Sequence, residues 1–298
     1  MQTAKWRRAV PEDANCVSAN NCIKKRRHIL DKHHIIYDLH EVVPYINWVY
    51  FYYAWQLRDK EAQSRTRKEA EDLLCQWEGI YHTHALFALG NANSDGDDIL
   101  FEGGHHLPML RQQTPHKGDP NLCMADFIRP LSQGVPDRMG IFCTTVDGAL
   151  EHDFLSDEYS RMMAQLLADR LAEATAELVH LQVRREYWGY APDEHLSIHD
   201  LQIEKFQGIR PAIGYPSLPD TSLNFVLDEV LHFADVGIRL TESGAMKPHA
   251  SVSGLMISHP AARYFMLGKI GDDQLRDYAR RRQVPVELMR RFLSSILT

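Results

Sequence analysis

Residues Tyr159–Val183, with the sequence YSRMMAQLLADRLAEATAELVHLQV, carry the strongest secondary-structure pattern in this chain. Apolar side chains recur at three- and four-residue steps along the stretch, which is the spacing of one face of an α-helix. The length is near the upper end for a helix of a globular protein. We therefore predict one long amphipathic helix here, and the rest of the fold is organised around it.

Shorter elements surround this helix. Apolar periodicity, prolines and glycines predict further helices at 57–78, Ser222–Gly237, Asp272–Arg281 and Pro285–Leu297, with two helical pieces meeting at Pro44 within Ile35–Trp55. Strand-like runs are His82–Leu89, Asp98–Glu102, Asp126–Pro130, Met139–Val146, Leu255–Ser258 and Tyr264–Leu267. The Gly90–Gly96 cluster predicts a loop that joins the first two strands into a hairpin. Helices and strands mix without βαβ regularity, which indicates an α+β fold.

Bulk properties exclude several classes of protein. The chain has 298 residues, a hydrophobic content of 44% and a formal net charge of −7, which argues against a nucleic-acid-binding protein. No apolar run is long enough to cross a bilayer, so we expect no membrane partner. Five cysteines without a C-x-x-C pair indicate reduced thiols and a cytoplasmic protein.

The N-terminal 36 residues differ from the remainder in charge. They hold eight Lys and Arg against three Asp and Glu, and they match no motif. We interpret residues 1–36 as a basic arm of unassigned role and residues 37–298 as one domain. A solvated tail and a docking element for an acidic partner both fit the arm.

The segment Arg210-Pro211-Ala212-Ile213-Gly214-Tyr215-Pro216 carries recognisable chemistry. Its prolines fix the backbone and favour extended neighbours, and Gly214 permits close approach to the main chain. Arg210 offers a planar fork that matches a carboxylate, and Tyr215 offers a face for a flat ring. The segment suits a ligand with an amino-acid end and a heterocyclic end, although a rigid surface turn is the plainer interpretation.

Further strings place this segment in a family. In chain order they are Leu110-Arg111-Gln112-Gln113, Ala125-Asp126-Phe127, Tyr187-Trp188-Gly189-Tyr190-Ala191-Pro192, Leu240-Thr241-Glu242-Ser243, Ala250-Ser251-Val252-Ser253-Gly254 and Ser258-His259-Pro260. With the 210–216 segment, this ordered set resembles the activation domain of cobalamin-dependent methionine synthase, from about Tyr45 to Thr298. The resemblance implies a single C-shaped α+β domain built around a bent antiparallel sheet flanked by helices.

The resemblance also implies a function. Domains of this family bind S-adenosylmethionine and remethylate an oxidised cobalamin, with electrons from a flavodoxin-like reductant. The reduced cobalamin is the nucleophile, so no catalytic side chain is expected and the protein contributes positioning. Two other interpretations stay open: a degenerate binding or regulatory module without catalysis, and a reactivator of another corrinoid methyltransferase.

Site residues follow from the family strings. The resemblance assigns Arg210 to the ligand carboxylate, Glu173 and Asn47 to amine or ribose groups, and the backbones of Ala212 and Gly214 with the rings of Tyr215, Tyr264 and Phe265 to the remainder. Asn47 departs from the family, which has aspartate before the tryptophan; the amide keeps an acceptor but loses the charge.

Cobalamin is expected from a partner. The ligating signature D-x-H-x-x-G is absent, because Ile36 and Ile198 stand where its glycine is required. The resemblance therefore implies a cobalamin-binding methionine synthase module as partner, with this chain acting either as a separate subunit or as a piece of a longer one. The histidine pairs lack the spacing of strong zinc motifs, and we predict no metal site.

Overall fold

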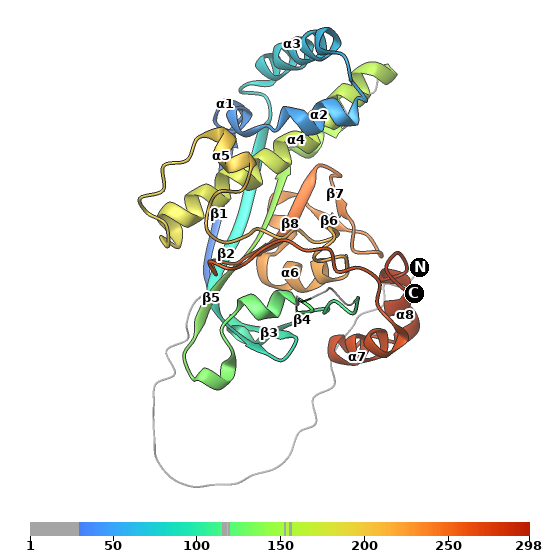
Figure 1. Ribbon diagram of the computed structural model, residues 1–298. Coiled ribbons are helices and arrows are strands. Elements are labelled where there is room, and N and C mark those ends of the chain that lie inside the picture. Colours follow the sequence, from blue (N-terminus) through green and yellow to red (C-terminus); the bar gives the residue numbers. More distant parts are fainter. Residues whose placement is uncertain (1–29, 115–117, 119, 152, 155–156) are drawn as a thin grey trace.

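A computed structural model describes residues 30–114, 118, 120–151, 153–154 and 157–298, so most of the basic arm lies outside it. Its centre is an antiparallel sheet in the order β4-β3-β2-β5-β8, with β1 also paired to β2 (Figure 1). The strands are β1 (Asp31–Asp38), β2 (His82–Asp95), β3 (Asp98–Phe101), β4 (His105–Pro108), β5 (Asp137–Val146) and β8 (Ser251–Met256), and β6 (Arg239–Leu240) pairs with β7 (Met246–Lys247). The expected α+β class with a bent antiparallel sheet flanked by helices is confirmed.

Both faces of the central strand β2 are buried. Ala85, Phe87 and Leu89 point into a core shared with four helices: α1 (Leu39–Val42), α2 (Trp48–Ala54), α3 (Lys60–Trp77) and α4 (Glu158–Gln182). Leu86 and Ala88 point into a second core shared with α6 (Leu223–Leu231). Alternate side chains of a strand leave opposite faces, so a strand covered on both sides must be apolar throughout. This explains the uninterrupted run ALFAL in β2, and it makes the sheet the partition between two cores.

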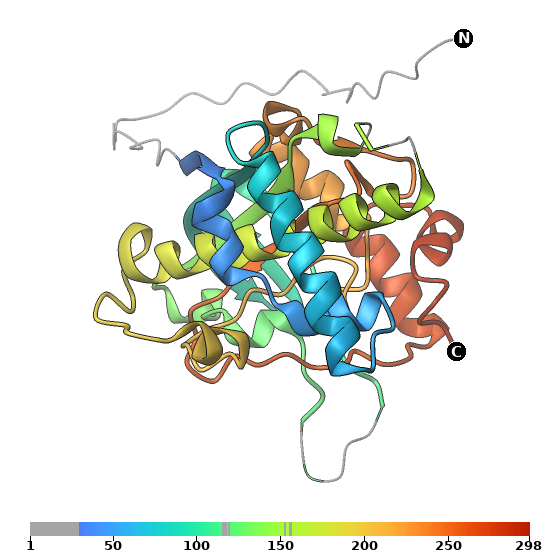
Figure 2. The same ribbon diagram turned by 90° about the horizontal axis from the view of Figure 1, so that it is seen from above.

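The long helix is confirmed as α4 (Glu158–Gln182). Asp157 is its N-cap, and the Asp157 carboxylate accepts from the Ser160 N–H. It lies across the sheet beneath α3 when the domain is seen from above (Figure 2). Its buried face is rich in alanine, and Thr144 Oγ1 of β5 donates to the Ala172 carbonyl at 2.9 Å. Small side chains let helix and strand approach closely enough for this bond.

The other helices largely follow the sequence. They are α1 (Leu39–Val42), α2 (Trp48–Ala54), α3 (Lys60–Trp77), α5 (Ile198–Gln202), α6 (Leu223–Leu231), α7 (Asp272–Arg282) and α8 (Val286–Phe292). The expected helix to Gly237 is shorter, because Asp228 closes it: its carbonyl accepts from His232 N–H and its carboxylate from Phe233 N–H. A 3-10 turn, Phe233–Val236, then leads to Gly237. No helix in the described residues combines the length and apolar character needed to cross a bilayer.

The expected loop at Gly90–Gly96 is wrong, because β2 continues to Asp95 and the turn lies at Gly96 and Asp97. The polar side chains that suggested a loop instead fasten the strand to the segment 128–135. Asn93 Nδ2 donates to the carbonyls of Arg129 and Val135, and Ser94 Oγ donates to that of Ile128. The extension lets β2 pair with β3 over 92–95, beyond the part that pairs with β1 over 82–89.

Two expected strands are also wrong. Asp126 lies in a 3-10 turn, Met124–Phe127, because its carboxylate accepts from the Cys123 N–H. The segment 264–267 joins no sheet, since side chains rather than a neighbouring strand bind its backbone.

The sheet begins earlier than the expected domain boundary. Strand β1 starts at Asp31 and pairs with β2 from Asp31↔Leu89 to Asp38↔His82. Residues 31–36, placed in the basic arm by charge, therefore belong to the sheet in this structure. The first helical piece accordingly starts at Leu39 rather than Ile35, and a 3-10 turn containing Pro44 links α1 to α2.

The segment 209–213 lies against the outer edge of β8. Ile209 exchanges hydrogen bonds with Ile257, the Ile213 N–H donates to the Ser253 carbonyl, and the Pro211 carbonyl accepts from the Leu255 N–H. Pro211 has no N–H, and it presents its carbonyl to the strand, so no ladder bond is lost. The segment thus covers the sheet edge and holds Arg210 in a fixed place.

This contact depends on two glycines. A Cβ on Gly254 would lie 2.2 Å from the Pro211 carbonyl oxygen, and one on Gly208 would lie 2.4 Å from the Ile257 carbonyl oxygen. Backbone atoms cannot yield as a flexible side chain would. Any other residue at Gly254 must push the 209–213 segment off the strand.

We expect Gly254→Ala to lower the free energy of unfolding by roughly 1–3 kcal/mol, the usual cost of overpacking. Urea titration followed by circular dichroism measures this. Gly148→Ala is the matched control, because a Cβ there meets its nearest neighbour only at 3.9 Å. Equal stability of the two variants would contradict the role given to Gly254.

Candidate functional site

A cavity of about 650 Å³ opens between α4, the start of α2 and the segments 210–217 and 264–266. Its walls combine carboxylates, arginines and aromatic rings: Tyr45, Asn47, Tyr50, Arg170, Glu173, Ala174, Glu177, Leu201, Gln202, Glu204, Arg210, Pro211, Ala212, Tyr215, Pro216, Ser217, Val252, Tyr264, Phe265 and Met266. A second cavity, of about 660 Å³, lies beside Thr241–Ser243 and α8 and contains none of the predicted site residues.

The structure brings seven of the eight predicted residues onto the first cavity: Asn47, Glu173, Arg210, Ala212, Tyr215, Tyr264 and Phe265. They come from four segments that are far apart in the chain. Gly214 is the exception, because it lies outside the lining, in a tight turn where its N–H donates to the Leu218 carbonyl at 2.7 Å.

Arg210 places a nearly buried guanidinium at the cavity wall. Nη1 and Nη2 donate to Glu177 Oε2 at 3.4 and 3.3 Å, and the Arg210 N–H donates to the Tyr264 hydroxyl at 3.0 Å. Burial disfavours the charged form, but the surrounding Glu177, Tyr264 and Glu173 outweigh it and raise the pKa of Arg210. The long contacts to a single carboxylate oxygen leave this cation available to a stronger, bidentate partner.

Tyr215 and Glu173 form a second contact between the 210–217 segment and α4 at the cavity. The Tyr215 hydroxyl donates to Glu173 Oε1 at 2.6 Å. Burial and the neighbouring Glu173 carboxylate raise the pKa of Tyr215, so the phenol stays protonated and remains the donor. The bond fixes the ring of an otherwise half-exposed tyrosine beside the cavity.

Asn47 has a structural role that its sequence position did not reveal. It is the N-cap of α2, and its Oδ1 accepts from the Val49 N–H at 3.1 Å. The cap uses the amide oxygen and leaves the amide nitrogen as the group able to face a ligand. Aspartate would cap the helix equally well, so the departure from the family changes charge rather than local structure.

Tyr264 and Phe265 stand on a segment held by its backbone. Ser217 Oγ donates to the Phe265 carbonyl and accepts from the Phe265 N–H, and the Leu267 N–H donates to the Pro216 carbonyl. Gln112 Nε2 adds a bond of 2.7 Å to the Met266 carbonyl. These bonds tie the segment 264–267 to residues 216–217 and to Gln112.

The residues Leu110–Gln113 do not line the cavity, but their side chains hold segments of its wall in place. Arg111 forms a bidentate pair with Asp126 at 2.8 and 2.6 Å, which joins two of the family strings. Gln113 bonds the Gly271 N–H and the Asp273 carboxylate at the start of α7. Gln113 thus binds the start of α7, and the neighbouring Gln112 binds the cavity wall at Met266, so this string connects the two.

Sequence reasoning missed Glu177, Glu204, Tyr45, Tyr50 and Arg170 in the lining. One signal was available for Glu177: it follows Glu173 by four residues in a helix, so both carboxylates share one face. Burial raises the pKa of Glu204, whose carboxyl lies near Arg210 and Glu177. The same signal was available for Arg170, which precedes Glu173 by three residues, whereas Tyr45, Tyr50 and Glu204 are brought to the cavity by tertiary packing.

A buried layer lies directly behind Arg210. Arg184 is fully buried, pairs with Glu194 at 2.7 Å, and stacks on the Phe206 ring at 4.1 Å. His180 Nδ1 lies 2.8 Å from Arg184 Nη1 and 3.5 Å from Arg210 Nη1. Guanidinium nitrogens only donate, so Nδ1 is the acceptor and the imidazole proton is on Nε2. Burial, followed by Arg184 and Arg210, lowers the pKa of His180 well below its ordinary value.

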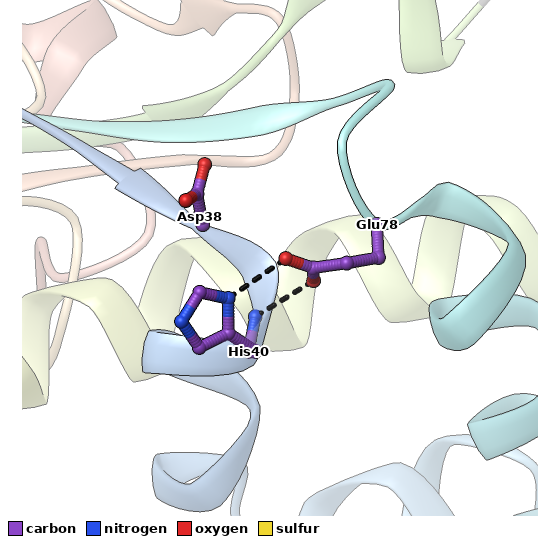
Figure 3. A group of neighbouring side chains, drawn as sticks. All are labelled: Asp38, His40 and Glu78. Atoms are coloured by element: carbon purple, nitrogen blue, oxygen red, sulfur yellow. Dashed lines mark hydrogen bonds and ion pairs between the residues drawn. The ribbon is translucent and has the colours of Figure 1, made fainter.

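One group of three side chains in the described part of the chain has metal-ligand composition: Asp38, His40 and Glu78 (Figure 3). All three are exposed and already have protein partners. Glu78 accepts from the His40 N–H at 2.9 Å and contacts His40 Nδ1 at 2.8 Å, while Asp38 lies 3.4 Å from His82 Nε2. These contacts account for the group without an ion, and we assign no metal to it.

The chain matches one family model and is similar to a solved structure. Residues 38–283 match the family described as the vitamin B12 dependent methionine synthase activation domain. The chain is also similar to a crystal structure of the MetH reactivation domain bound to AdoHcy. The two are 38% identical, the match covers 91% of each chain, and the TM-score is 0.84.

The neutral, buried His180 predicts a pH dependence of stability. Its pKa is lowered on folding, so the unfolded chain binds a proton more readily, and stability is lost as pH falls below about 6.5. Between pH 7 and 5.5 this histidine should cost about 1 kcal/mol of unfolding free energy. His180→Asn keeps an acceptor near the Nδ1 position and cannot titrate, so we expect it to lose less stability than the unaltered protein over this range. Urea titrations at both pH values test this, with the exposed His195→Asn as control; identical pH slopes for all three proteins would contradict it.

Proposed function

Because the chain belongs to the family of vitamin B12 dependent methionine synthase activation domains, we propose that its cavity binds S-adenosylmethionine and presents the methyl group to a corrinoid carried by a partner module. The observation that carries the proposal is the composition of one cavity: a nearly buried arginine, carboxylates one helical turn apart, and aromatic rings. The bound AdoHcy of the similar MetH reactivation domain supports the same ligand class.

The residues present fit such a ligand. A cavity of about 650 Å³ has the size usual for small-molecule sites. Arg210 can receive a carboxylate in its planar fork, the Glu173 carboxylate can accept from amine or ribose groups, and the Asn47 amide nitrogen can donate to a ribose oxygen. Tyr264 and Phe265 offer ring faces for adenine, and the 210–216 backbone lies alongside.

In this proposal the protein positions the ligand and shields it from water. Arg210 and the carboxylates of α4 orient the amino-acid and ribose groups, while the segment 264–266 keeps water from the adenine end. The corrinoid of the partner supplies the nucleophile for the sulfonium methyl group, and a flavodoxin-like protein supplies the electrons. No side chain of this chain needs to donate or accept a proton in that transfer.

The setting proposed is the cytoplasm. Cys75, Cys123 and Cys143 are free thiols, and burial raises the pKa of Cys123 to about 12 and that of Cys143 as well. The two buried thiols, Cys123 and Cys143, therefore stay protonated and unreactive.

Reconstitution tests the function. The chain is mixed with a cobalamin-loaded methionine synthase module, a low-potential reductant and S-adenosylmethionine, and the corrinoid spectrum is followed. We expect recovery of the methylcobalamin spectrum, and none when the chain or S-adenosylmethionine is omitted. Ligand binding without recovery would favour a regulatory module, and recovery only with another corrinoid protein would reassign the partner.

Arg210 provides a sharper test of the ligand. We expect Arg210→Ala and Arg210→Lys both to weaken S-adenosylmethionine binding by roughly 1.5–3 kcal/mol, because an ammonium cannot reproduce the bidentate fork. Isothermal titration calorimetry measures the change. Arg161→Ala, which removes an exposed arginine of α4 outside the cavity lining, is the control. Affinity of Arg210→Ala equal to that of the control would remove Arg210 from the site.

A further inference from the structure

Glu177 carries an unsatisfied oxygen at the cavity. Its Oε2 accepts both contacts from Arg210, but its Oε1 is buried and has no hydrogen-bond partner in the described part of the chain. A buried carboxylate oxygen without a donor is unfavourable, and native proteins rarely leave one unless a ligand or water completes it. The free oxygen therefore marks a missing donor.

The missing donor is best supplied from the cavity. The side chain of Glu177 lines the cavity and is 16% exposed, so some of its atoms face the open space. The terminal torsion of glutamate is broad, so a modest rotation can turn Oε1 toward the cavity. Rotation becomes favourable once a ligand carboxylate takes over the guanidinium of Arg210, which now holds Glu177 only through contacts of 3.3 and 3.4 Å.

Three other side chains with acceptor oxygens line the cavity, and their surroundings differ from those of Glu177: Glu173, Asn47 and Glu204. Glu173 Oε1 already receives the Tyr215 hydroxyl at 2.6 Å, and Asn47 Oδ1 caps α2. Glu204 is exposed on the rim. Glu177 alone among these acceptors stands in contact with Arg210, so the two present a cation and an anion side by side, as the carboxylate and ammonium of an α-amino acid require.

We propose that Glu177 is the residue that binds the ammonium group of the ligand, and that with Arg210 it forms the clamp that recognises an α-amino acid end. This inference rests on the proposed function, because it needs an adenosyl ligand that carries an amino acid. It leaves Glu173, held by Tyr215, for the ribose hydroxyls.

The test compares two ligands on several variants. Calorimetry is run with S-adenosylhomocysteine and with its analogue lacking only the amino group, on the unaltered protein, Glu177→Gln and Glu158→Gln. Glu158 is exposed in the first turn of the same helix and serves as the charge-matched control. We expect Glu177→Gln to weaken S-adenosylhomocysteine at least about tenfold and the analogue less than about threefold, since only the first ligand loses a charge-assisted bond.

Each other outcome is decisive. Equal losses for both ligands would mean that Glu177 acts only by holding Arg210, and no loss would remove it from the site; either result overturns the inference while the proposed function stands. If the unaltered protein binds neither ligand, the proposed function itself fails. Thermal unfolding checks each variant, and Glu177→Asp, which keeps the charge but shortens the reach, should show the same selective loss if Glu177→Gln does not fold.

Discussion

The close approach of the 209–213 backbone to strand β8 is the contact on which the site depends. It is possible because positions 208 and 254 have no side chain, which leaves room for carbonyl oxygens that a Cβ would strike. The contact covers a sheet edge that would otherwise expose unpaired backbone groups. It also places Arg210 opposite the carboxylates of α4, so a packing requirement of the sheet becomes the geometry of the cavity.

The charges around the cavity are arranged in layers on either side of Arg210. Arg210 lies between a cavity with several carboxylates and a buried layer in which Arg184 is already neutralised by Glu194. His180 separates the two guanidinium groups and stays uncharged, because burial and then the two neighbouring positive charges lower its pKa. This arrangement keeps Arg210 paired only loosely, by one oxygen of Glu177, and thus available to an incoming anion.

Sequence reasoning succeeded where local physics decides the outcome. Periodicity placed α4 within one residue at each end, and the ordered family strings pointed to seven residues that the fold gathers on one cavity. It failed where a side chain bonds a distant backbone. Asn93 and Ser94 suggest a loop until their partners at 128–135 are known. The residue types at 264–267 suggest a strand, but Ser217 and Gln112 bind the backbone of this segment in place of a neighbouring strand. Glu177 was missed because its meaning depends on Arg210, which lies 33 residues away in the chain.

The wall at 264–266 has a property that matters for the evolution of specificity. The bonds from Ser217, Gln112 and Pro216 reach only main-chain atoms of residues 265–267, so they do not depend on which side chains stand there. Shape and chemistry are therefore separable in this wall. Phe265 also packs against the core, but Met266 is exposed, so its replacement can alter what the cavity accepts while the backbone keeps its course. Position 266 therefore gives natural variation and protein engineers a place to diversify ligand preference without rebuilding the domain.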